Sequence, residues 1–255
     1  MAVTLVGIWL YFGLAADGFP GTPSACLTRF VCYCEVPRSG LARQPANTWS
    51  NIAFFPVAVW VALDAAKRAL EHGALALRFG LVFALAASVQ GLSSMYFHGS
   101  LTTWGAISDA VSMFIVPGLL IAVNLLRLAW LGPALALAPV LASVVCAFAF
   151  RLFVFPSMAP LMLIFAIGIA LGEWRANRRD ENRKARGYFL LALGLLGVGA
   201  LTWTLSLRPG FPLCSSRMPW GHAAWHVIAA ALLGVLWLYV RATLSGIAGR
   251  ARVVA

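Results

Sequence analysis

Five polar residues interrupt the apolar stretches of this sequence at spacings that could support metal chemistry. Ser94 and His98 close one apolar stretch, and Asp109 opens the next one. His222 and His226 open the last apolar stretch. Residues four apart lie one turn apart on the same face of a helix, so each pair presents its two side chains together. Ionisable residues are costly within a membrane span, and for that reason they indicate a functional site.

Three neutral imidazoles with one open coordination position form the ligand set of a catalytic zinc site, in which the pKa of a bound water falls to about 7. The sequence therefore predicts zinc ligation by His98, His222 and His226. Asp109 is available to take the proton of that water or to orient a histidine. Ser94 is available to donate a hydrogen bond to the water or to an oxyanion. A lone HxxxH pair also fits histidines that hydrogen-bond neighbouring helices, but five such residues at one depth favour the metal site.

The stretches that carry these residues are long enough to cross a membrane. Hydrophobic residues make up 62% of the 255-residue chain and charged residues 11%, against about 45–50% and about 25% in soluble proteins. A transmembrane helix needs roughly 20 mostly apolar residues. Seven stretches approach this length: 48–66, 78–98, 105–127, 131–150, 156–174, 187–206 and 220–241. The prediction is an all-α integral membrane protein with a seven-helix bundle.

The basic residues predict which ends of these helices face the cytoplasm. The formal net charge is +11, but no nucleic-acid-binding motif accompanies it, so we expect no nucleic-acid partner. Short cytoplasmic loops collect Lys and Arg. If the first span starts outside, only six of the 19 Lys and Arg residues lie outside: Arg29, Arg38, Arg43, Arg151, Arg208 and Arg217. The second span then ends, and the third and seventh begin, at the extracytoplasmic face, which places all five polar residues there.

Residues 1–45 are predicted to stay outside the bundle. Residues 2–16 are apolar but short for a span and lack the basic start of a signal peptide, so they fit a short extra helix, an uncleaved anchor or a weak export signal. Residues 17–45 are rich in Gly, Pro and Cys and predict an irregular extracytoplasmic cap. We expect a membrane domain at 46–245 and a cytoplasmic tail at 246–255.

Four of the five cysteines lie in the predicted outer segments: Cys26, Cys32, Cys34 and Cys214. An oxidising compartment there permits disulfides, but the sequence leaves their connectivity open, a Cys26 to Cys32 bridge included. Cys146 lies inside the fourth span, where the simplest interpretation is a small apolar core residue.

Asn47 and Asn51 lie one turn apart at the start of the first span. The spacing predicts that they cap this helix and hydrogen-bond its neighbours. We prefer this interpretation to a catalytic role.

Longer motifs around these residues resemble a known family. The alkaline ceramidase family, within the CREST superfamily of seven-helix proteins, is similar to SSMYFHGSLTTWGAISD at 93–109 and to HAAWH at 222–226. The similarity extends to CEVPRSGLARQPANTWSNIAF at 34–54, which resembles the glutamate-then-NTxSN pattern that opens the family's first helix. This segment favours the ceramidase branch over the adiponectin-receptor-like branch. The resemblance covers nearly the whole chain after Tyr33.

The resemblance implies hydrolysis of the ceramide amide bond to a sphingoid base and a fatty acid. It also implies zinc bound by the residues that match its three histidines, here His98, His222 and His226. The family's functional serine and aspartate match Ser94 and Asp109.

The resemblance further favours a disulfide between Cys34 and Cys214. Eukaryotic members carry a calcium site before the first helix, built from several acidic side chains and an Asn, and Glu35 fits one of its ligands. Cys32 and Gln44 stand where two further acidic residues are expected. Calcium prefers six to eight oxygen ligands, so the resemblance does not supply a complete calcium site here.

Three functions remain to be separated. The first is a zinc-dependent amidase acting on ceramide or another N-acyl lipid of the membrane. The second is an esterase or phospholipid-remodelling hydrolase of the same superfamily. The third is a receptor or sensor with a structural zinc site, in which Asp109 would be dispensable. The Ala-, Arg- and Gly-rich composition favours a bacterial plasma membrane.

Overall fold

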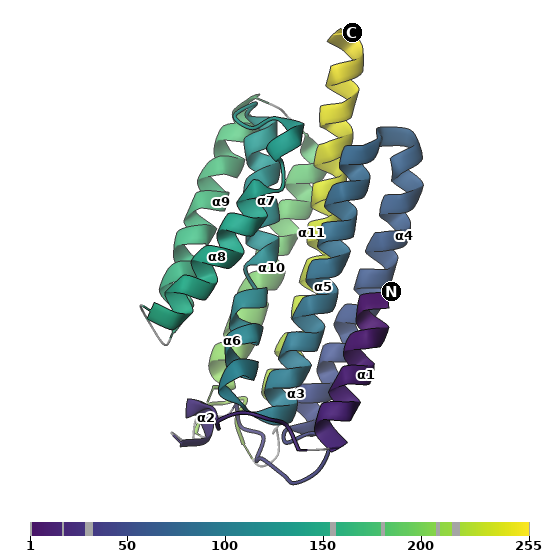
Figure 1. The fold of residues 1–255 in the computed structure, drawn as a ribbon. Helices are drawn as coiled ribbons and strands as arrows, with labels where there is room; N and C mark the ends of the chain where they lie inside the picture. Colours follow the sequence, from purple (N-terminus) through teal and green to yellow (C-terminus); the bar gives the residue numbers. More distant parts are fainter. Residues whose placement is uncertain are drawn as a thin grey trace. The chain divides into compact units, whose positions relative to one another are not determined.

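In the computed structural model, the described residues are 2–16, 18–28, 33–153, 157–179, 182–207, 210–215 and 220–254 (Figure 1). The regular elements of these residues are helices, which confirms the predicted all-α fold. Two short helices precede the first span: α1 (Ala2–Ala16) and α2 (Ala25–Thr28). The others are α3 (Pro45–Trp49), η1 (Ser50–Ala53), α4 (Phe54–His72), α5 (Ala74–Ser100), α6 (Thr103–Ser112), α7 (Ile115–Arg127), η2 (Pro133–Leu135), α8 (Ala138–Phe153), α9 (Ala159–Arg179), α10 (Arg183–Leu205) and α11 (Gly221–Val254).

Seven helical stretches of the described residues are long and apolar enough to cross a membrane. They are Pro45–Glu71, Ala74–Ser100, Thr103–Arg127, Pro133–Phe153, Ala159–Arg179, Arg183–Leu205 and Gly221–Ile247. Each overlaps one predicted stretch, so the seven-span prediction is confirmed and the chain is a multi-pass membrane protein. Large apolar side chains remain exposed on the spans, among them Leu163, Ile164 and Leu190. Exposed apolar surface of this kind suits lipid chains rather than water.

A proline interrupts the span that contains α6 and α7. Pro117 has no backbone N–H, and its ring clashes with the carbonyl of the fourth residue before it, Met113. The helix accordingly breaks at Met113 and Phe114. The Ser143 hydroxyl of α8 donates to the Phe114 carbonyl in this break, at 2.8 Å. The break therefore serves as an attachment point for α8.

The described chain forms two compact units, each treated separately below. Unit 1 comprises Met1–Val59, Ala87–Asp109 and Ala192–Leu233. Unit 2 comprises Trp60–Ala86, Ala110–Leu191 and Gly234–Ala255. The predicted division into a cap, a membrane domain and a tail stays a prediction.

In unit 1, α1 packs beside the second half of α5 (Figure 1). The buried hydroxyls of Thr4 and Ser88 are hydrogen-bonded at 3.0 Å. The Tyr11 hydroxyl donates to the Leu41 carbonyl at 2.8 Å. A side chain at Gly99 would place its Cβ within 2.2 Å of the Tyr11 oxygen, so only glycine permits this approach. The apolar segment 2–16 is therefore a short helix of the fold.

The residues just before α3 lie across the end of α5 in unit 1. The backbone N–H groups of Arg43 and Gln44 donate to the carbonyls of Gly99 and His98, at 3.0 and 3.1 Å. These carbonyls belong to the last turn of α5, which has no intrahelical donors left for them. The pairing places the side chain of Gln44 beside His98.

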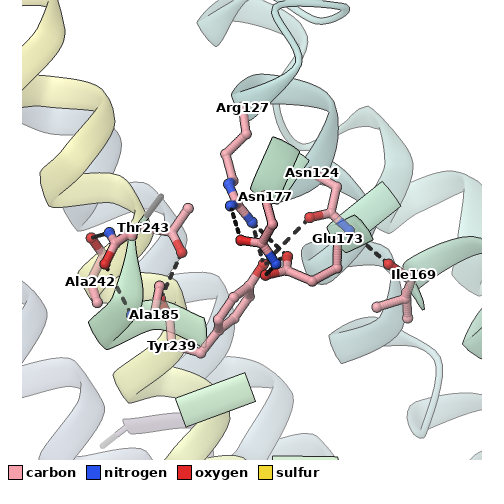
Figure 2. Close-up of polar contacts among 10 residues, drawn as sticks. Asn124, Arg127, Ile169, Glu173, Asn177, Ala185, Tyr239, Ala242 and Thr243 are labelled. Carbon is pink, nitrogen blue, oxygen red and sulfur yellow. Dashed lines mark hydrogen bonds and ion pairs between the residues drawn. The ribbon is translucent and has the colours of Figure 1, made fainter. Parts of the chain in front are cut away.

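Unit 2 contains a buried polar network that joins α7, α9 and α11 (Figure 2). Arg127 forms an ion pair with Glu173, and their side chains are 0% and 3% exposed. The Tyr239 hydroxyl donates to the same carboxylate. Asn177 accepts a hydrogen bond from Arg127 at 2.9 Å and donates to Glu173 at 3.0 Å. Each charge of the buried pair is therefore matched, as burial in a low-dielectric interior requires.

Candidate metal centre

Three histidines of unit 1 converge at the end of α5 and the start of α11. His98 lies in the last turn of α5, and His222 and His226 lie one turn apart at the start of α11. They are 0%, 3% and 3% exposed. One nitrogen atom from each ring lies within 4.8 Å of the other two. Because zinc–nitrogen bonds are about 2.0–2.1 Å long, small side-chain rotations would bring all three onto one ion.

The tautomer of His98 follows from its hydrogen bond to Gln44. The His98 Nδ1 lies 2.8 Å from the Gln44 Oε1. Gln44 donates its amide to the Glu35 carbonyl at 2.8 Å, which identifies the other atom as oxygen. Nδ1 therefore carries the proton, and Nε2 has a free lone pair. This Nε2 is buried and has no hydrogen-bond partner in the described part of the chain, as expected of a metal ligand.

His226 has a similar arrangement on the other side of the cluster. Its Nδ1 lies 2.7 Å from the Ser50 hydroxyl. Ser50 donates its own proton to the Asn47 carbonyl at 3.1 Å, so it accepts the proton of His226. The amide nitrogen of Asn51 lies 3.3 Å from this Nδ1, but it is itself a donor, so Ser50 is the acceptor of the ring proton. Second partners of this kind hold the rings of metal-binding histidines in one orientation and one tautomer.

His222 is held by an aromatic neighbour. The Tyr33 ring stacks on it with centroids 3.9 Å apart and planes 17° from parallel. The His222 Nδ1 is buried and, among the described residues, has no hydrogen-bond partner. Burial and the negative charge of Asp109 together raise the pKa of Tyr33 to about 12, so its phenol stays protonated at neutral pH. Two bare imidazole nitrogens in one buried cluster fit a metal ion better than an apolar core, where each would be an uncompensated polar atom.

Asp109 and Ser94 lie together in the same unit. Gln90 donates to the Asp109 carboxylate at 3.2 Å, and the Ser94 side chain also hydrogen-bonds it. Ser94 stands one turn before His98 on α5, while Asp109 comes from α6. The structure thus brings all five predicted site residues into unit 1, with the carboxylate held by two neutral side chains. Their catalytic roles stay predictions.

A family model described as Ceramidase matches residues 41–251. This chain belongs to the Ceramidase family. The match includes all three histidines, Ser94 and Asp109. No curated protein sequence matches the chain.

In this ceramidase-family chain, the sequence pattern did not identify the residues that orient the histidines. Gln44 stood out in the sequence only because the family has an acidic residue at this position. Ser50 stood out only as part of the NTWSN motif. Gln90 and Tyr33 carried no signal. The detectable feature would have been polar side chains inside or just before an apolar span, because such groups need partners there.

Glu35 organises the start of the first span in the ceramidase fold. Its two carboxylate oxygens accept the backbone N–H groups of Ala46 and Asn47, both at 2.8 Å. The helix begins at Pro45 with Gln44 at the N-cap, so the prediction that Asn47 caps it is wrong. Glu35 belongs to no group of three metal-ligating side chains in the described residues. Its calcium-ligand role stays a prediction, and Cys32 lies outside the described residues.

The disulfide that the resemblance to the alkaline ceramidase family predicts is confirmed. Cys34 and Cys214 are bonded across 180 residues, with Cα atoms 5.2 Å apart. This bond ties the residue after Tyr33 to the segment before α11, and so ties the aromatic neighbour of His222 to its own helix. The Cys26 to Cys32 alternative cannot be compared, since Cys32 lies outside the described residues. The core interpretation of Cys146 is wrong, because this thiol is exposed on α8.

Substituting Gln44 by methionine is expected to weaken zinc binding by roughly 10- to 100-fold, the usual effect of removing a second partner of a metal-binding histidine. The apolar side chain has a similar length but cannot accept the His98 proton. Competition with a chelator measures the affinity. Gln90→Met is the matched control, because Gln90 donates its hydrogen bond to Asp109. Equal zinc affinity in Gln44→Met and the wild type would show that this hydrogen bond does not support a metal ligand.

Removing the disulfide with Cys34→Ser and Cys214→Ser together is expected to lower the free energy of unfolding by roughly 2–4 kcal/mol. The bond limits the freedom of a long chain segment in the unfolded state. Thermal unfolding of the purified protein in one detergent measures the change. Cys146→Ser serves as control, since it removes an exposed free thiol. A double variant as stable as this control would contradict the expectation.

Proposed function

We propose that this chain is a zinc-dependent intramembrane lipid amidase that hydrolyses ceramide to a sphingoid base and a fatty acid. The observation that carries the proposal is the buried cluster of three histidines, two with bare nitrogens, in the same unit as Asp109 and Ser94. Membership of the Ceramidase family supports a lipid amide as substrate. The seven apolar spans support a substrate that stays in the bilayer.

His98, His222 and His226 would hold the zinc ion. When bound, zinc polarises a carbonyl oxygen and makes water a stronger nucleophile at neutral pH. Gln44 and Ser50 keep the protons of His98 and His226 on Nδ1, which leaves their Nε2 atoms free to ligate. These hydrogen bonds prepare the cluster before substrate arrives.

Asp109 is placed to move the proton that amide hydrolysis requires. The attacking water loses a proton as its oxygen bonds to the carbonyl carbon, and the amine nitrogen gains one as the C–N bond breaks. A carboxylate near the reacting atoms can accept the first proton and deliver it to the nitrogen. Ser94 positions Asp109 by its hydrogen bond and is a candidate donor to the developing oxyanion.

We further propose that this site faces the extracytoplasmic side. The support is the distribution of Lys and Arg, which gathers in the loops at the opposite ends of the spans. In a bacterial plasma membrane the substrate would enter from the outer leaflet.

One purification tests the proposed chemistry. Bound zinc is measured first, and the protein is then assayed on N-acyl and O-acyl lipids that carry the same fatty acid. We expect zinc-dependent release of fatty acid from ceramide and none from glycerolipid esters. Release from esters alone would instead assign the chain to the lipid esterases, and bound zinc without any turnover would favour a receptor.

A further inference from the structure

A cavity of unit 2 lies where α9 ends and α10 begins. It has a volume of about 190 Å³ and is lined by Asn177, Asn182, Arg183 and Arg186. Both helices are apolar spans, so their adjoining ends mark the depth at which the hydrocarbon core gives way to lipid headgroups. The volume corresponds to roughly six water molecules, which is enough room for a phosphate group.

The charge lining this cavity is positive. Arg183 and Arg186 are exposed, and among the described residues neither guanidinium group forms a hydrogen bond or an ion pair. Both belong to the first turn of α10, where the helix dipole adds partial positive charge. The Asn182 side chain accepts the Ala185 N–H at 3.0 Å, which fixes the backbone of this turn.

Glu173, the carboxylate that contacts the lining residue Asn177, is already neutralised. Asn177 connects the cavity to the buried network, because its side chain bonds both Arg127 and Glu173 (Figure 2). Glu173 is paired with Arg127, so it does not offset the charge of Arg183 and Arg186. Asp180 and Glu181, which separate α9 from α10 in the sequence, lie outside the described residues.

We propose that this cavity binds a phosphate group, carried by an anionic phospholipid headgroup or present as free phosphate. Two arginines without partners offer planar sets of donors that match phosphate oxygens. Basic pockets between transmembrane helices are suited to phospholipid headgroups. Through Asn177, an occupied cavity would stabilise the network that joins α7, α9 and α11. The assignment does not depend on the hydrolytic activity proposed above.

The test measures thermal unfolding of the full chain in phosphatidylcholine nanodiscs at constant ionic strength. In one arm phosphatidylglycerol is titrated into the bilayer, and in the other inorganic phosphate is added to the buffer. A ligand that binds the folded state raises the unfolding temperature in proportion to its occupancy. We expect a rise that saturates, and we expect Arg183→Gln with Arg186→Gln to weaken the apparent affinity by roughly tenfold or more.

The matched control is Lys67→Gln with Lys184→Gln, which removes two exposed positive charges outside the cavity lining and should retain the wild-type affinity. A response to phosphatidylglycerol alone assigns a lipid headgroup, and a response to inorganic phosphate assigns the free anion. Neutralising Asp180 and Glu181 should leave binding intact or strengthen it. The proposal is overturned if neither ligand raises the unfolding temperature, or if the control pair loses affinity as much as the arginine pair does.

Discussion

Replacing His222 by alanine is expected to abolish zinc binding and to lower the rate of lipid hydrolysis by roughly a thousandfold or more. A catalytic zinc site uses three protein ligands, and removal of one leaves two, too few to retain the ion. The loss of several kcal/mol of charge stabilisation then appears in the rate. Metal analysis of the purified variant and release of fatty acid from ceramide measure the two effects.

His72→Ala is the control for this experiment, because His72 is the one histidine of the sequence that is not a predicted zinc ligand. It should bind zinc and turn over as the wild type does. If His222→Ala kept stoichiometric zinc, the ion would be bound elsewhere and the proposed centre would be wrong. If it lost zinc but kept its activity, hydrolysis would not depend on the metal.

Substituting Asp109 by asparagine is expected to leave zinc bound and to lower the rate by roughly 10²- to 10⁴-fold, the usual contribution of a general acid or base. Asparagine retains the size of the side chain and can still bond Gln90 and Ser94, but it cannot accept a proton. The separation of metal content from rate is the informative result, because it distinguishes a catalytic role from a role in folding or metal binding.

Glu71→Gln provides the matched loss of one carboxylate at an exposed position of α4, and its rate should be unchanged. A full hydrolytic rate in Asp109→Asn would show that Asp109 does not take part in the proton transfer. If the wild type itself turned over no lipid while Asp109→Asn kept its biological function, the chain would be a receptor with structural zinc.

The membrane fold could be predicted well because its signals are local. A span is recognised from about 20 consecutive residues, and the seven stretches agree with the helices at their centres. Their ends were less accurate: α5 begins four residues before the predicted 78, and α11 continues well past 241. A helix continues for as long as its backbone hydrogen bonds do, and a hydropathy pattern does not register these bonds. The break before Pro117 was also missed, although a proline inside a span is a sufficient local cause.

The candidate site was predictable only as far as its ionisable members. His98, Asp109 and His222 are conspicuous because their surroundings are apolar. Gln44 and Ser50 are uncharged and lie close to a span boundary, where polar residues are ordinary, so nothing distinguished them in the sequence. Glu35 shows the converse: it was recognised as a metal-ligand candidate, and in the structure its carboxylate holds the first N–H groups of α3.

The sequence by itself determined that the chain is a multi-pass helical membrane protein, and it predicted which ionisable residues share one end of its helices. Helical periodicity and the alternating direction of successive spans suffice for both inferences, since both patterns can be read from residues that are close together in the chain. Only the tertiary structure decided which nitrogen of each histidine is free. The hydrogen bond of His98 comes from 54 residues away and that of His226 from 176, and such pairings arise from the packing of distant segments, which no local pattern encodes.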